Sequence, residues 1–244
     1  MGAVQLLDPQ PGSAAPTPAL AGRGLELSWQ HLRRWWGRLR VGGRWLDHCW
    51  GARAGAWLAR SVGFGFALTA LSLARPLPDA ALALLRMALV AMSWCAGLAA
   101  LSLAGPALDG SLAAGRGLFE SRGISLASAR AERPFLLLRW TLVKLGVLVL
   151  LVLAACAIAT NDPLRASRLI ALAGGALVYL AALGSGLGAV AHVCHELGGA
   201  RGRAWLTGIV LLPELVSPAW PELPTLVKSY AALLDLCLGL GGGA

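Results

Sequence analysis

Long apolar runs alternate with short polar segments along the chain, and this pattern predicts its elements. A helix needs about 20 mostly apolar residues to cross the hydrocarbon core of a membrane. Four runs reach that length, and two shorter runs follow near the C-terminal end. The predicted spans cover residues 54–74, 80–104, 136–160, 169–194, 204–216 and 226–240. The pattern therefore predicts an all-α, polytopic helical membrane protein with about six transmembrane helices.

The last two predicted spans are short and interrupted by polar residues. The fifth contains Pro213 and Glu214, the sixth contains Lys228 and Asp235, and PELVSPAWPELP lies at their junction. Two arrangements fit: two short helices joined by a re-entrant segment, or one span followed by an interfacial helix. We favour two spans, because prolines at membrane depth mark irregular backbone that is buried in protein.

The segment WQHLRRWWGRLR, at residues 29–40, is rich in tryptophan and arginine. If residues 25–39 form a helix, five apolar side chains lie on one face as a stripe, and Arg33 and Arg34 lie off that stripe. The stripe consists of Leu25, Trp29, Leu32, Trp36 and Leu39. Such a helix lies in the membrane interface, with its indoles at headgroup depth and its arginines toward anionic lipid. We expect a flexible tail over residues 1–22, this amphipathic interfacial helix within residues 23–50, and a transmembrane domain over residues 51–244.

Composition decides between lipid and nucleic acid as the partner of this basic segment. Hydrophobic residues make up 57% of the chain and charged residues 14%, whereas soluble domains have about 45–50% apolar and about 25% charged residues. No predicted soluble domain presents the arginines to a phosphate backbone. We therefore expect membrane lipid, and no nucleic acid, as the partner.

Basic residues are distributed unevenly between the two sides of the predicted spans. Sixteen Lys and Arg fall on one side and four on the other, with Arg86 inside a span. Positive charge marks the cytoplasmic side of membrane proteins. This predicts a multi-pass inner-membrane protein with a cytoplasmic N-terminus, a cytoplasmic loop over residues 106–135, and residues 161–168 and 217–224 outside.

The sequence HVCHELGG, at residues 192–199, resembles the start of a zinc signature. That signature needs two histidines four residues apart on one helix face, but Gly199 stands at the second position. His192, His195 and Glu196 form only a weak ligand set, and the alternative is a helix end followed by glycine caps. We favour the helix end and expect no metal and no cofactor. The chain also lacks the P-loop motif GxxxxGK[ST], so we do not expect an enzyme.

Two other features lie inside predicted spans. Arg86 is a charge at membrane depth, which is a functional-site hypothesis by default. It either snorkels to the outer end of its helix or pairs with Asp79 or Glu214, and its structural and functional interpretations both stay open. The sequence GSGLG, at residues 184–188, offers small side chains for close helix approach, or alternatively a hinge.

The order of these elements resembles the permease subunits of the second type of ABC exporter. Those subunits have six spans, an interfacial helix before the first, a cytoplasmic coupling helix between the second and third, and a re-entrant segment between the last two. Here the corresponding segments are residues 25–40, the loop DGSLAAGRGLFESRGISLASARAERPFLLLRW, and LLPELVSPAWPELP. The resemblance implies that Phe119, Glu120, Arg122 and Ile124 contact an ATPase.

The resemblance also implies a function and partners. The chain would be a permease subunit that moves an unknown substrate across the membrane, in a homodimer or heterodimer of permease chains, with energy from a separate P-loop ATPase subunit. The alternative is a non-transporting membrane anchor or scaffold subunit of a larger complex. A third hypothesis, an intramembrane metalloenzyme, would need the two histidines of HVCHELGG as ligands.

Overall fold

The described part of the chain consists of helices and their connections. The computed structural model describes residues 29, 31–37, 39, 43–72, 78–106, 132–160, 166–220, 222 and 225–239, and none of these residues forms a strand. The chain divides into two compact units, Met1–Gly37 and Arg38–Ala244. The all-α class predicted from the sequence is confirmed for the described residues.

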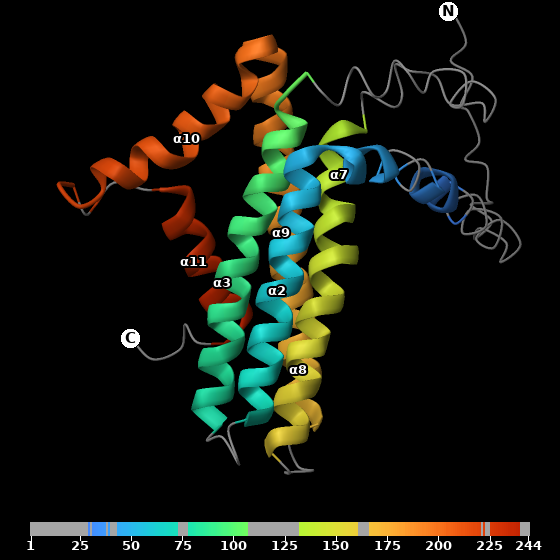
Figure 1. The fold of residues 1–244 in the computed structure, drawn as a ribbon, viewed down its shortest axis with the longest axis vertical. Coiled ribbons are helices and arrows are strands. Elements are labelled where there is room, and N and C mark those ends of the chain that lie inside the picture. Colours follow the sequence, from blue (N-terminus) through green and yellow to red (C-terminus); the bar gives the residue numbers. More distant parts are fainter. Residues whose placement is uncertain are drawn as a thin grey trace, which may run out of the picture. The chain divides into compact units, whose positions relative to one another are not determined.

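Four helical stretches among these residues are long and apolar enough to cross a membrane. They belong to the second unit and comprise α2 (Trp50–Ser72), α3 (Pro78–Leu103), the continuous helix Arg133–Ala159, and a stretch that begins in α9 (Ala166–Gly198). The third is made of α7 (Arg133–Trp140), a π-helical turn η1 (Thr141–Leu145) and α8 (Gly146–Thr160). Figure 1 shows α2, α3, α8 and α9 running along one another as a bundle.

Small residues on one face of α2 let it approach α3 closely. The buried face consists of Gly51, Ala52, Gly55, Ala59, Gly63, Ala67 and Ala70. A Cβ atom on Gly55 would lie 2.6 Å from the carbonyl oxygen of Cys95 on α3. Helices in lipid associate through van der Waals packing and close backbone approach, because lipid tails are as apolar as the side chains. This stripe therefore holds α2 and α3 together.

The GSGLG sequence acts in the same way on α9. A Cβ atom on Gly184 would meet Thr141 and Leu138, and one on Gly188 would meet the carbonyl oxygen of Pro134. The Thr141 hydroxyl also reaches the carbonyl oxygen of Leu180 on α9, at 3.1 Å, from within the π-helical turn. The prediction that GSGLG permits close helix approach is confirmed.

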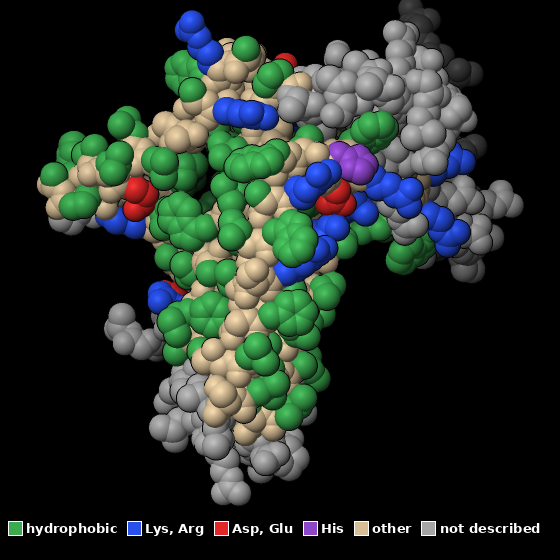
Figure 2. Space-filling model, viewed as in Figure 1, with side chains coloured by type: hydrophobic (Ala, Val, Ile, Leu, Met, Phe, Trp, Pro, Cys, Tyr) green, Lys and Arg blue, Asp and Glu red, His purple; other side chains and the backbone are tan. Residues whose placement is uncertain are grey.

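The four long helices define two ends of the bundle. At one end α2 begins, α3 ends, α7 begins and α9 ends. We call it the arginine end, because it carries Arg44, Arg133, Arg201 and Arg203. Figure 2 shows hydrophobic side chains over the lower part of α2, α3 and α8, away from that end.

The fifth and sixth predicted spans are too short to cross a membrane as single helices. After the 3₁₀ turn η3 (Gly199–Arg201), α10 (Gly202–Val216) has 15 residues and α11 (Leu226–Cys237) has 12. At 1.5 Å per residue these lengths are about 22 and about 18 Å, less than the ~30 Å of a hydrocarbon core. Among the described residues, four helical stretches are therefore long and apolar enough to cross a membrane, fewer than the six spans predicted. Helix α10 also continues through Pro213, so irregular backbone begins only after Val216.

The direction of α11 also differs from the prediction. The Tyr230 hydroxyl lies against Gly186 of α9, and the carbonyl oxygen of Cys237 lies against Gly175. Helix α11 thus runs antiparallel to α9, away from the arginine end. Its first residue, Leu226, borders the same cavity as Leu101 near the end of α3. The start of α11 therefore lies in the half of the bundle nearer the arginine end, whereas residues 217–224 lie partly outside the described residues and their predicted place outside the membrane stays a prediction.

Replacing Gly55 by leucine should separate α2 from α3. The new side chain would overlap the α3 backbone, and overpacking of this kind costs about 1–3 kcal/mol of unfolding free energy. The matched control is Gly65→Leu on the same helix, where a Cβ atom has no neighbour within 4 Å. Denaturant unfolding of the two purified variants in mild detergent measures the difference. Equal stability of the two would contradict close α2–α3 packing.

Candidate functional site

The carboxyl end of α3 is capped by two arginines from distant parts of the chain. Arg133, at the start of α7, donates through Nη2 to the carbonyl oxygens of Leu103 and Gly105, the latter at 3.1 Å. Arg203, in the first turn of α10, donates through Nε to the carbonyl oxygen of Leu101 at 3.2 Å. Helix ends leave carbonyls unpaired and carry partial negative charge. The two guanidinium groups supply both the missing donors and the compensating charge.

We call this group of residues the α3 junction: Leu101, Leu103, Gly105, Arg133 and Arg203. Two further elements reach it. The backbone nitrogen of Ala52 on α2 donates to the hydroxyl of Ser102 at 3.0 Å. A Cβ atom on Gly202 would collide with the carbonyl oxygen of Ala104, so the start of α10 lies directly against the end of α3.

Arg133 is the residue that makes the junction costly to disturb. Its side chain is only 2% exposed, and burying an unpaired charge is strongly unfavourable. It also stands at the first position of α7, where the dipole of its own helix disfavours a cation. The carbonyls of α3 offset both effects. Burial raises the pKa of the nearby Cys49 thiol, and the positive charges of Arg203 and Arg133 offset part of that rise.

The junction lies at the base of the predicted coupling loop. Gly105 directly precedes the predicted loop of residues 106–135, and Arg133 lies near the end of that loop, where α7 begins. The hydrogen bond between these two residues closes the base of the segment 107–131. The predicted coupling residues Phe119, Glu120, Arg122 and Ile124 lie outside the described residues. Their contact with an ATPase therefore stays a prediction.

Arg86 forms an ion pair with a residue of α11. Its Nε and Nη2 atoms donate to the two carboxylate oxygens of Asp235, at 2.6 and 2.9 Å. Both side chains are partly exposed. The prediction of a partner in Asp79 or Glu214 is wrong, since both bonds go to Asp235, 149 residues away. Two parallel bonds from a guanidinium fix geometry as well as charge, so this pair fastens α11 to α3.

The HVCHELGG sequence forms a helix end. Helix α9 ends at Gly198, and Gly199 has φ of 50°, the left-handed conformation typical of a glycine that follows a helix. His192 Nδ1 lies 3.9 Å from a carboxylate oxygen of Glu196. Among the described residues, no group of three or more His, Cys, Asp or Glu side chains is arranged to hold a metal ion. The helix-end interpretation is confirmed.

The residues of the predicted interfacial anchor lie in the first unit. Residues 31–37 are helical, and Trp29, Leu32, Arg33 and Arg34 are exposed within that unit, whereas Trp36 is half-buried beside Trp35. Residues 1–28, with the predicted tail, lie outside the described residues. Placement of this helix in a membrane interface stays a prediction.

Comparison with protein-family models, with curated proteins and with solved structures finds no match for this chain. The candidate site therefore depends on its own geometry. The sequence identifies Arg133 and Arg203 only as charges that mark a side of the membrane. The position of Arg133 at the start of an apolar helix was the available signal, because a cation there needs a compensating partner.

Exchanging the two charges of the Arg86–Asp235 pair tests its role. Arg86→Asp alone and Asp235→Arg alone should each loosen α11, because two like charges would then face each other at membrane depth. The double exchange should restore the thermal stability of the purified protein toward that of the wild type. Failure of the double exchange to recover any stability would contradict a direct ion pair between α3 and α11.

Proposed function

We propose that this chain is a multi-pass membrane protein that works as the permease subunit of an ABC-type exporter, in a pair of permease chains with a separate ATPase. Four helical stretches long enough to cross a membrane support the first part. The observation that carries the second is the α3 junction, in which Arg133 anchors the base of the loop between the second and third helices.

A loop that transmits force must be attached stiffly to the helices it moves. Arg133 ties the loop's C-terminal end to the last turn of α3, so a push on the loop acts on α3 and α7 together. Arg203 ties the same turn of α3 to α10. Closure of ATPase subunits against the loop would therefore act together on α3, on α10 and on the continuous helix that begins with α7.

The arginine end faces the cytoplasm in this proposal. The loop of residues 107–131 joins α3 to α7 at that end and carries Arg116, Arg122 and Arg130, and positive charge is retained on the cytoplasmic side of inner-membrane proteins. The absence of a P-loop motif from the sequence is consistent with nucleotide hydrolysis on a partner chain. Because α10 and α11 are shorter than the two spans that the resemblance implies, we base the proposal on the loop and not on the number of spans.

The coupling loop provides the most direct test. Phe119→Ala together with Glu120→Ala should release an ATPase that co-purifies with the wild type from native membranes, because truncating a central aromatic contact often costs about 2 kcal/mol or more of binding free energy. The readout is mass spectrometry of proteins bound to the tagged chain. The matched control is Trp205→Ala with Glu214→Ala, which removes one aromatic and one acid from α10 instead.

Two outcomes would contradict this proposal. If the tagged wild type brings down no P-loop ATPase, the chain is better described as a non-transporting scaffold or anchor. If both double variants release the ATPase equally, the loss reflects general disturbance of the fold and the loop has no special part in binding.

A further inference from the structure

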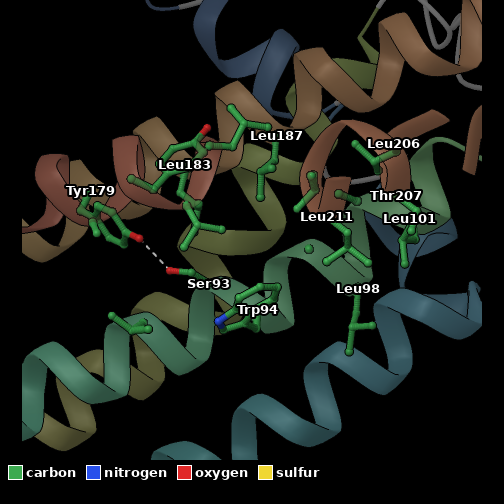
Figure 3. A pocket seen from close by; sticks show the side chains of 18 residues that line it. Ser93, Trp94, Leu98, Leu101, Tyr179, Leu183, Leu187, Leu206, Thr207 and Leu211 are labelled. Carbon is green, nitrogen blue, oxygen red and sulfur yellow. Dashed lines mark hydrogen bonds between the residues drawn. The ribbon is translucent and has the colours of Figure 1, made fainter. Parts of the chain in front are cut away.

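An apolar cavity lies between α3, α9, α10 and α11, close to the α3 junction. Its volume is about 260 Å³, and 18 residues from these four helices line it. Figure 3 shows Leu206, Thr207 and Leu211 of α10 on one side, across from Trp94, Leu98 and Leu101 of α3. The volume is just below the ~300 Å³ at which small-molecule pockets usually begin. A cavity of this size suits part of an extended hydrocarbon chain.

Three hydroxyl groups on the walls, those of Ser93, Tyr179 and Thr207, are engaged in hydrogen bonds within the protein. The Ser93 hydroxyl donates to the carbonyl oxygen of Leu89 at 2.7 Å, which leaves its oxygen to accept from the Tyr179 hydroxyl at 2.7 Å. The Thr207 hydroxyl donates to the carbonyl oxygen of Arg203 at 2.9 Å. A ligand that needs several hydrogen bonds gains little from these groups. The cavity therefore favours hydrocarbon.

The cavity opens onto the outer surface of the bundle. Trp94 and Leu211, on opposite walls, remain 50% and 42% exposed. Apolar cavities of this kind do not hold water, and an unfilled one forfeits the van der Waals contacts of its lining. In a bilayer, the hydrocarbon next to such an opening is the acyl chain of a lipid.

Charge indicates which lipid fits. Arg203 lies at the arginine end of the cavity, since its Nε bonds the carbonyl oxygen of Leu101, a lining residue. Arg201, two residues earlier in the 3₁₀ turn η3, is exposed. Two arginines at the cytoplasmic end of an apolar slot complement an anionic headgroup. The chain of that lipid would then extend past Leu98 and Trp94 toward the Ser93–Tyr179 pair.

We infer that this cavity binds one acyl chain of an anionic membrane phospholipid, with the headgroup beside Arg203. The site is independent of the proposed transport function, because a scaffold subunit would hold the lipid in the same way. The lipid would fill the space between α10 and α3 and so support the two short helices.

Gly97 offers a variant that fills the cavity without disturbing the fold. It lines the cavity, and a Cβ atom there has no heavy atom within 4 Å. Gly97→Leu should therefore occupy the volume of the chain. Gly65→Leu on α2 is the matched control, because it makes the same exchange at another open helical position outside the cavity.

The experiment uses the full chain in vesicles of phosphatidylcholine and phosphatidylglycerol, with a trace of phosphatidylglycerol that carries a diazirine in one acyl chain. After irradiation, cross-linked peptides are mapped by mass spectrometry. We expect cross-links concentrated in residues 90–101 and 226–231, reduced about tenfold in Gly97→Leu, which corresponds to about 1.4 kcal/mol of binding free energy, and unchanged in Gly65→Leu. A phosphatidylcholine probe with the same chain should give a lower yield.

Three results would overturn the inference. One is equal labelling of the wild type and Gly97→Leu, and another is labelling spread evenly over all exposed apolar helix faces. The third is an equal cross-linking yield from the phosphatidylcholine probe, which would rule out a preference for an anionic headgroup. If Gly97→Leu does not reconstitute, Ala231→Leu fills the cavity from the α11 wall and gives the same comparison.

Discussion

The cap on the carboxyl end of α3 is the interaction on which the rest of this structure depends. A buried guanidinium and a group of unpaired helix-end carbonyls are each unfavourable alone, and the hydrogen bonds from Arg133 Nη2 to two of these carbonyls reduce both costs. An unsatisfied buried polar group costs about 1–3 kcal/mol, so Arg133 and the last turn of α3 have little freedom to separate. Because residues 107–131 lie between these two partners, the same contact closes the base of the largest loop between the long helices.

The short helices α10 and α11 depend on α3 at two separate points. Arg203 holds the start of α10 to the arginine end of α3, and the Arg86–Asp235 pair holds the far part of α11 lower on the same helix. Between these points the side chains of α3 and α10 do not meet fully, and the apolar cavity remains. Polar contacts at two points of α3 therefore attach both short helices to it, and the apolar cavity lies between these points.

Local pattern was enough to predict the four long helices and the helix end at Gly198. A run of about 20 apolar residues has few alternatives in a membrane protein, and paired glycines after a polar turn mark a C-terminal cap. The arrangement of α10 and α11 was not predictable in this way. It depends on Asp235, which in sequence is only an interruption of an apolar run, and on its partner Arg86, 149 residues away. The α3 junction depends on backbone carbonyls, which leave no mark in a sequence.

Amide hydrogen exchange on Arg133→Met is the most direct test of the junction. Methionine has a similar length but no donors, so the carbonyls of Leu103 and Gly105 would lose their partner. We predict faster exchange in residues 99–106 and also in residues 202–206 of α10, with α8 unchanged. Faster exchange confined to residues 107–131, with the last turn of α3 and the start of α10 protected as in the wild type, would contradict the account.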